Sequence, residues 1–224
     1  MSRKLIDVSH EIEAGMTTYP GLPAPAISDY LSRAASPGRY SEGTTFQIGR
    51  IEMIANTGTY VDAPFHRFAE GDDLASLPLE RLADMLGVVI DATNLKDRAI
   101  DVDQFPQIFD ILGLKNCAVL IRTGWDIHWR TEQYGNEAPF LTRAAAEYLA
   151  TAGVALVGID SVNIDDMGDG ERPVHTVLLG AGIPIAEHLC NLDKLPLSGF
   201  RFHAVPVKFC GVGTFPVRAY AVIE

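Results

Sequence analysis

An aspartate and a histidine four residues apart, Asp62 and His66, form the first pair in the chain that could do chemistry. They lie in the segment "NTGTYVDAPFH", beside a Thr-Gly-Thr turn and with Pro64 between them. A carboxylate and an imidazole can bind a metal ion together or exchange a proton. Spacing alone is weak evidence, because most such pairs are surface residues or helix caps. The apolar context of this pair strengthens that evidence.

A second group of titratable side chains lies further along the chain. It consists of Asp160, Asp165, Asp166, Asp169, Glu171, His175, Glu187 and His188. His175 and Glu187 flank the apolar run "TVLLGAGIPIA", which we expect to be buried, and a buried imidazole or carboxylate without a partner is costly. The two residues could pair in a structural network or bind a divalent metal. The acidic run "DDMGDGE" lacks the ligand order of a calcium-binding loop and is interpreted as a solvated turn.

Two other features are less specific. Trp125 and Trp129 flank His128 and could form the wall of a pocket for a planar ligand, although large aromatic side chains more often belong to the core. Cys210 has only Lys208 nearby to lower its pKa, so we expect a buried structural cysteine rather than a nucleophile.

The composition excludes several classes of partner. The 224-residue chain has a formal net charge of −11, whereas surfaces for nucleic acid or anionic membranes need clustered Lys and Arg. Three cysteines without a C-x-x-C pair indicate neither a disulfide framework nor a thiolate zinc site, and fit a reducing compartment. No secretory signal is recognised, and no apolar run reaches the roughly 18 residues of a membrane span. We therefore expect a cytoplasmic protein that binds a small-molecule substrate, with no nucleic-acid or membrane partner.

The elements that must position these side chains alternate between strands and helices. Strands are predicted over residues 4–9, 44–54, 87–93, 117–125 and 154–160, and in the C-terminal segment 201–224. The strand over 44–54 alternates apolar and polar residues, as a half-buried strand would. One helix is predicted within 74–87, and another follows the capping residue Thr142 and ends near Gly153. The Gly- and Pro-rich segment "GMTTYPGLPAPAI" is interpreted as an irregular loop and a candidate lid.

Helices followed by buried strands indicate an α/β fold. With 47% hydrophobic and 21% charged residues, the chain can form a substantial core. No repeat, low-complexity tract or linker divides it. We expect one domain over residues 1–224.

Together these segments resemble the metal-dependent hydrolase family that includes bacterial kynurenine formamidase and isatin hydrolase, often called the cyclase-like family. The family signature is H-x-G-T-H-x-D-A-P-x-H, and residues 56–66 of this chain are "NTGTYVDAPFH". The resemblance covers almost the whole chain, through "IDVSHEI", "LIRTGWD", "GVALVGIDSVNID", "HTVLLGAGIPIAEHL" and "FPVRAYAVI". It implies one domain with a mixed, partly closed, barrel-like sheet and helices packed outside. It also implies a homodimer or homotetramer with pockets near the subunit boundary.

The resemblance implies roles for four residues. Asp62 corresponds to the carboxylate that bridges two zinc ions in the family. His175 and Glu187 correspond to two further metal ligands. His66 corresponds to the histidine that donates and accepts a proton in catalysis.

Two imidazoles of the signature are replaced, by Asn56 and Tyr60. Asn56 offers only a weak amide oxygen, and a phenol binds metal well only when deprotonated, so neither replaces a neutral imidazole. Tyr19 stands where family members carry a tryptophan over the substrate. Asn163 and His188 stand where serine and asparagine are expected. These changes gather around the site that the resemblance implies.

Three functions remain open. The first is a metal-dependent hydrolase of the amide bond in a small cyclic amide or aryl-formamide. In it, Asp62, His175 and Glu187 would hold one zinc or manganese ion that activates water. The second is a metal-free protein that binds a small molecule, and the third is a metal-independent enzyme with His66 and Tyr60 as an acid–base pair. The retained ligands favour the first, in which Tyr19 and Trp125 of this chain would contact the substrate.

Overall fold

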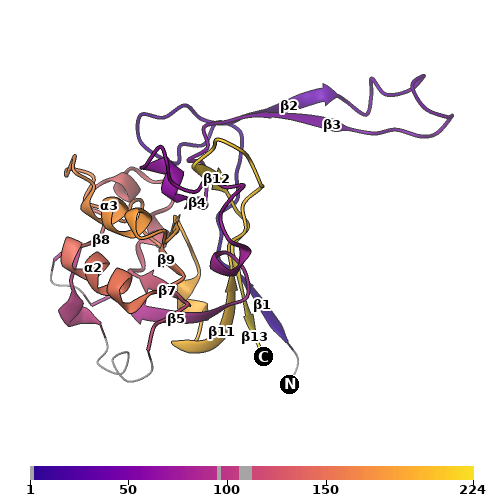
Figure 1. Ribbon diagram of the computed structural model, residues 1–224. Coiled ribbons are helices and arrows are strands. Elements are labelled where there is room, and N and C mark those ends of the chain that lie inside the picture. The colour runs from indigo at the N-terminus through magenta and orange to yellow at the C-terminus, as the bar shows by residue number, and fades with distance from the viewer. Residues whose placement is uncertain (1–2, 95–96, 106–112) are drawn as a thin grey trace.

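A nine-stranded mixed sheet, curled into a half-barrel, forms the centre of the molecule in the computed structural model, which describes residues 3–94, 97–105 and 113–224 (Figure 1). In spatial order its strands are β1 Lys4–Asp7, β13 Tyr220–Ile223, β11 Ser198–His203, β5 Met85–Asp91, β7 Cys117–Arg122, β9 Leu156–Ile159, β10 Ile185–Glu187, β4 Tyr60–Asp62 and β12 Thr214–Pro216. The adjacent strands β5, β7, β9 and β10 are parallel, and the strands on either side of them are antiparallel. This confirms the predicted α/β fold with a partly closed mixed sheet.

The central strands are buried on both faces, as parallel strands between two layers usually are. In β5, Val88 and Ile90 join a core that includes residues of the helices α2 (Arg143–Ala152) and α3 (Pro173–Gly180), whereas Val89 belongs to a second core. Both helices lie on the same side of the sheet (Figure 1). The prediction of helices packed outside the sheet is therefore confirmed.

The helix α2 begins and ends where its sequence predicts. The hydroxyl oxygen of Thr142 accepts a hydrogen bond from the backbone N–H of Ala145, which satisfies one of the free donors at the helix start. Gly153 follows the last turn in a left-handed conformation with φ of 71°. Such a residue commonly ends a helix because glycine has no Cβ to clash.

The helix predicted within residues 74–87 is wrong. This segment contains only a 3₁₀ turn over Leu79–Arg81, and β5 begins at Met85. Gly87 lies inside that strand, where an added Cβ would lie 2.0 Å from the ring of Phe200. The apolar spacing suits a helix, but pairing of β5 with β7 and β11 determines the structure instead.

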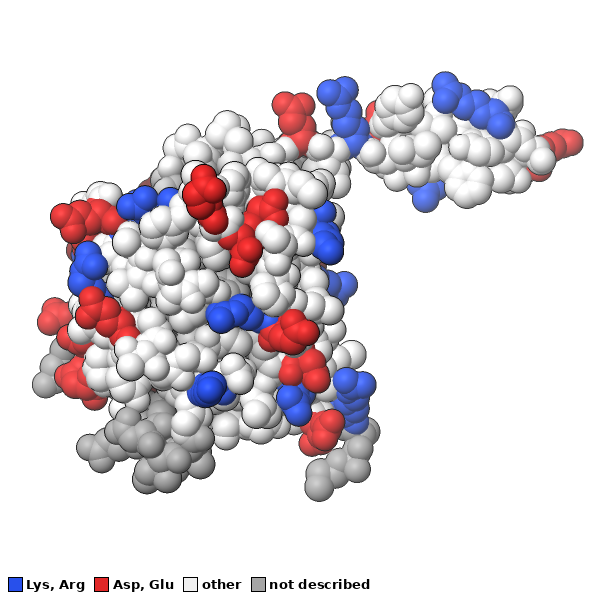
Figure 2. Space-filling model, in the orientation of Figure 1, with Lys and Arg blue, Asp and Glu red and all other residues white. Residues whose placement is uncertain are grey.

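A two-stranded hairpin of β2 (Ala26–Leu31) and β3 (Ile48–Glu52) projects from the body of the molecule (Figures 1 and 2). The expectation of a half-buried strand over 44–54 is wrong, because every residue of β3 is exposed. Apolar side chains are nevertheless present on the hairpin. Ile27, Tyr30, Phe46, Ile48 and Ile51 are 46%, 72%, 51%, 44% and 63% exposed.

The remaining elements are short. A parallel pair is formed by β6 (Ala99–Ile100) and β8 (Phe140–Leu141). Further 3₁₀ turns span Pro64–His66, Val102–Gln104, Trp125–His128, Glu132–Gly135 and Leu192–Lys194. The strands predicted over 4–9, 117–125 and 154–160 are confirmed with shorter bounds, and the one over 87–93 begins two residues earlier. The C-terminal strands join the same sheet.

Within the described residues, none of the helices has the length and hydrophobicity needed to cross a membrane.

Candidate active site

The strand β4 aligns two site residues through its alternating side chains. Tyr60 and Asp62 point to the same face of the sheet, whereas Val61 between them belongs to the second core. Tyr60 is the cross-strand partner of Glu187 on β10, and Asp62 is that of Thr214 on β12. Side chains directly opposite in an antiparallel pair are close enough to interact. Residues far apart in sequence therefore meet through strand register.

His66 follows β4 in the 3₁₀ turn that begins at Pro64. The strand β12 approaches this turn closely, because an added Cβ on Gly213 would lie 2.4 Å from the backbone nitrogen of His66. The backbone N–H of Ala63 donates to the carbonyl oxygen of Gly213 at 2.7 Å. The second glycine of "GVG" is thus required for packing and is not part of a nucleotide-binding loop.

Thr214 connects Asp62 to His66. Its hydroxyl donates to Oδ1 of Asp62, and its oxygen lies 2.8 Å from Nδ1 of His66. Because the hydroxyl has one hydrogen and gives it to Asp62, the Nδ1 atom of His66 must be the donor in the second bond. The neutral ring then carries a lone pair on Nε2. His66 is 37% exposed at its side chain, so this nitrogen is placed to act as a base.

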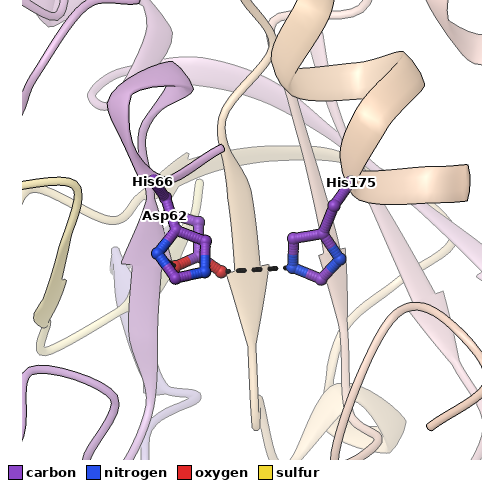
Figure 3. A group of neighbouring side chains, drawn as sticks. All are labelled: Asp62, His66 and His175. Carbon is purple, nitrogen blue, oxygen red and sulfur yellow. Dashed lines mark ion pairs between the residues drawn. The ribbon is translucent and has the colours of Figure 1, made fainter. Parts of the chain in front are cut away.

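His175, on α3, is the imidazole nearest to the buried carboxylates (Figure 3). Its Nδ1 atom lies 2.6 Å from Oδ2 of Asp165, and its Nε2 atom lies 3.6 Å from Oδ2 of Asp62 and 3.8 Å from Oε1 of Glu187. Burial opposes a charged ring, but the hydrogen bond to Asp165 and the nearby carboxylates of Asp62 and Glu187 outweigh it and raise the pKa of His175 to about 10. In the absence of a bound cation, the ring of His175 is therefore protonated at neutral pH.

The donor set fits a divalent cation. Three carboxylates, of Asp62, Asp165 and Glu187, are buried around the ring of His175, so negative charge is in excess. Within the part of the chain that the structure describes, Oδ2 of Asp62 is buried without a hydrogen-bond partner. Such an atom is available to bind a metal ion. Asp165 contacts Nδ1 of His175, and metal-binding histidines usually form a hydrogen bond of this kind through the ring nitrogen that does not bind the metal. One ligand atom each from Asp62, His66 and His175 also lie within 4.8 Å of one another.

Glu187 is also the first member of a chain of hydrogen bonds that leads away from His175. The hydroxyl of Tyr60 donates to its Oε2 atom at 2.7 Å, and the backbone N–H of Ile164 donates to Oε1 at 2.7 Å. The oxygen of Tyr60 lies 3.3 Å from Nε2 of His188, whose Nδ1 atom lies 2.9 Å from the hydroxyl of Tyr134. Because Tyr60 gives its hydrogen to Glu187, Nε2 of His188 donates to Tyr60 and Nδ1 accepts from Tyr134.

Burial determines the protonation of this chain. It lowers the pKa of His188 to about 3, so the ring is neutral. Burial, followed by the charges of Glu187 and Asp62, raises the pKa of Tyr60 well above its ordinary value, so the phenol keeps its proton. Burial also raises the pKa of Glu187 to about 7. Tyr60 thus acts as a hydrogen-bond donor in this structure.

A cavity of about 290 Å³ lies over these groups. It is lined by Tyr19, Leu22, Asn56, Tyr60, His66, Arg67, Asn163, Arg172, His175 and Glu187. Six of the predicted site residues are in this set, and Asp62 is fully buried beside His175. Trp125 is not brought to this cavity, because its indole N–H donates to the carbonyl of Tyr134 and its ring lines another cavity with Thr93 and Arg98.

Sequence reasoning missed several residues of the site. Asp165 lies in the acidic cluster and Thr214 follows "GVG", but nothing local identifies them as partners of His175 and Asp62. Arg67 and Arg172 were also missed, although Arg67 directly follows His66 and Arg172 lies three residues before His175. The expectation for Cys210 is wrong, since this cysteine is free and exposed.

The sequence matches a family model over residues 6–166, and that family is Cyclase, described as "Putative cyclase". The chain belongs to the Cyclase family. A similar family relative is the kynurenine formamidase of Geobacillus thermodenitrificans (strain NG80-2), which is 30% identical over 219 residues, covering 98% of this chain and 97% of the relative.

Solved structures of Cyclase-like proteins have the same fold. A protein described as "Potential Metal-Dependent Hydrolase With Cyclase Activity" superposes with a TM-score of 0.80 at 26% identity, covering 100% of this chain and 99% of the other. Isatin hydrolase A from Labrenzia aggregata, bound to benzyl benzoate, superposes with a TM-score of 0.82 at 23% identity, covering 99% and 94%. The resemblance found in the sequence is therefore confirmed.

Proposed function

We propose that this Cyclase family member is a metal-dependent hydrolase of the amide bond in a small cyclic amide or aryl-formamide. The observation that carries the proposal is the buried Oδ2 atom of Asp62, which has no hydrogen-bond partner among the described residues and lies 3.6 Å from Nε2 of His175. The full-length similarity to kynurenine formamidase supports the reaction class. The metal-dependent hydrolase with the same fold supports a bound cation.

Asp62, His175 and Glu187 would hold the ion, which would be zinc or manganese given a mixed set of imidazole and carboxylate ligands. A bound divalent cation supplies Lewis-acid activation of water and of the carbonyl. Asp165 fixes the tautomer of His175, because it accepts the hydrogen of Nδ1 and leaves Nε2 free to bind. His66 would take a proton at Nε2 and deliver it to the leaving nitrogen.

We propose one ion rather than two. The phenol of Tyr60 stands between Glu187 and His188 and forms hydrogen bonds with both. A protonated phenol is a poor ligand, and its donation to Glu187 uses one oxygen of that carboxylate. Asn56 lines the cavity but offers only an amide oxygen. Tyr60, which replaces an imidazole of the family signature, would therefore position Glu187 and not bind a second ion.

The proposal is tested by the metal content of protein purified without chelator. We expect about one zinc or manganese ion per chain by elemental analysis. Turnover of aryl-formamides such as formanilide, or of cyclic amides such as isatin, should be lost on chelation and restored by the metal. Protein that is free of metal, and whose behaviour added zinc or manganese does not change, would contradict the proposal. That result would favour the metal-free binding protein.

The third function, a metal-independent acid–base pair of His66 and Tyr60, is less well supported. The side chain of Tyr60 is 1% exposed and its hydrogen is directed to Glu187. Hydrolysis that is insensitive to chelators would favour this pair over the metal.

We also propose that the chain forms a homodimer or a tetramer built from dimers, through the β2–β3 hairpin. Isolated two-stranded hairpins are at best marginally stable in water, yet this one exposes Tyr30 and Ile51. Sedimentation velocity should find dimers or tetramers at micromolar concentration. The double variant Tyr30→Asp and Ile51→Asp should shift the protein toward monomer. Ile127→Asp, at an exposed residue outside the hairpin, should not. A wild-type monomer would contradict this assembly.

A cytoplasmic location remains a prediction. It accords with the three free cysteines, of which Cys117 and Cys190 are buried.

A further inference from the structure

Two arginines line the candidate active-site cavity, although the chain as a whole is strongly acidic. They are Arg67 and Arg172. Among the described residues, neither forms an ion pair, whereas six other arginines do. Those six are Arg98, Arg122, Arg130, Arg143, Arg201 and Arg218. Other described arginines also lack an ion pair, but Arg67 and Arg172 are the two whose charge is present where a substrate would bind.

Arg172 is free because its acidic neighbours pair with other residues. Asp166 lies 3.4 Å from a guanidinium nitrogen of Arg98, and Glu171 lies 3.7 Å from one of Arg143. Both carboxylates precede Arg172 in the sequence, and each is thus already partly neutralised by another arginine. This arrangement keeps one guanidinium available in a loop that is otherwise acidic.

The guanidinium of Arg172 is held in place by neutral groups. Its Nη1 atom donates to the backbone carbonyl of Asp166 at 3.1 Å, and its Nη2 atom donates weakly to the hydroxyl of Tyr19 at 3.4 Å. Five N–H donors belong to a guanidinium, so at least three remain for a ligand. The residue is half-buried, which protects a charge–charge contact from part of the solvent screening.

Arg172 and Tyr19 form the boundary between two cavities. Both residues line the active-site cavity of about 290 Å³ and also a larger neighbouring cavity of about 1110 Å³. Arg172 has a left-handed backbone, with φ of 49° and ψ of 60°, at the start of α3. A non-glycine residue in this conformation is strained, and glycine would avoid that strain.

We propose that Arg172, assisted by Arg67, binds a carboxylate group of the substrate. This inference rests on the proposed function and narrows its substrate class to an aryl-formamide or cyclic amide that carries a carboxylate. The planar guanidinium matches a carboxylate through two parallel hydrogen bonds, more closely than a lysine would. With the anion at Arg172, the rest of a single-ring substrate would occupy the cavity that His66 and His175 also line.

In this arrangement, Tyr19 would contact both Arg172 and the substrate. Its hydroxyl accepts from Arg172 and its ring lines the cavity, so it would pack against the aromatic ring while it orients the guanidinium. The predicted aromatic contact at Tyr19 and the anion contact at Arg172 would thus act on neighbouring parts of one substrate.

A binding experiment with metal-free protein separates this inference from catalysis. Benzoate and its neutral isostere benzamide are titrated by calorimetry into protein dialysed against a chelator. We expect benzoate to bind at least about 10-fold more tightly than benzamide, as for a charge-assisted pair. Arg172→Gln should abolish that preference, Arg172→Lys should retain part of it, and Arg67→Gln should weaken it. The control Arg122→Gln, whose arginine pairs with Asp91 outside the cavity, should leave it unchanged.

A kinetic experiment gives the second readout. Formamidobenzoates are compared with their methyl esters, using metal-loaded protein. Arg172→Gln should raise KM for the acids by about 10-fold and leave KM for the esters within about 2-fold, with kcat little changed. Equal binding of benzoate and benzamide, or a preference that survives Arg172→Gln, would overturn the inference. If no formamide is hydrolysed but benzoate binding depends on Arg172, the proposed function fails and the anion site stands.

Discussion

Replacement of Asp62 by Asn is expected to remove the bound transition metal and to lower amide hydrolysis by at least about 100-fold. Loss of a residue that only supports a ligand commonly costs 10- to 100-fold in metal affinity or activity, and a direct ligand should cost more. Asp62 is fully buried, and its Oδ2 atom has no hydrogen-bond partner among the described residues. The amide of Asn is nearly the same size but has no charge to balance a cation.

Elemental analysis and steady-state rates measure the two effects of Asp62→Asn. His175→Gln should have the same result, because Gln offers no imidazole nitrogen at the position of Nε2. The control Asp91→Asn removes an exposed carboxylate that pairs with Arg122 outside the cavity, and should retain metal and activity. A circular dichroism spectrum like that of the wild type shows that the variant is folded. Full metal content in folded Asp62→Asn would contradict the assigned ligand.

Replacement of His66 by Gln should lower kcat by about 10²- to 10⁴-fold while the metal remains bound. That range is typical of losing a general acid–base group. The assignment follows from Thr214, which gives its hydrogen to Asp62, so that the neutral ring of His66 donates from Nδ1 and carries its lone pair on Nε2. Thr214→Val should have a smaller effect of the same kind, because it removes the hydroxyl that orients the ring.

The metal content of His66→Gln distinguishes two roles for this residue. His66 also has a ligand atom within 4.8 Å of those of Asp62 and His175. Retained metal with lost turnover supports proton transfer, whereas loss of the metal would show that His66 is a ligand and would contradict the assignment. His128→Gln, at a histidine outside the cavity, is the matched control and should keep both metal and rate.

How far the sequence predicts this fold depends on whether local or distant contacts form each element. The helix α2 is predicted correctly because its cap at Thr142 and its end at Gly153 are local signals. The segment 74–87 has apolar residues at helical spacing, but its last residues pair with β7 and β11, which are distant in sequence. Local pattern cannot reveal that pairing. The exposure of β3 likewise cannot be predicted locally, because it results from the projection of the β2–β3 hairpin away from the body of the molecule.

The candidate site likewise divides into residues that the sequence identifies and partners that only the folded structure brings to them. Asp62, His66, His175 and Glu187 are predicted because a signature and its spacing identify them. Their partners are not, because strand register supplies them. Thr214 is opposite Asp62 only through β12, and Tyr60 meets His188 only because β10 lies beside β4. The replacement of an imidazole by Tyr60 is visible in the sequence, whereas its donation to Glu187 requires the folded sheet.

The position of β4 between β10 and β12 has a consequence for folding. The donor atoms of Asp62 and Glu187 come from adjacent strands, and that of His175 comes from the helix just before β10. A cation held by all three would bind only the native register, and would stabilise it by mass action. Because side chains alternate along a strand, a slip of β4 by one residue would turn Asp62 toward the apolar core and release the ion. Metal binding would thus be thermodynamically linked to correct pairing at this end of the sheet.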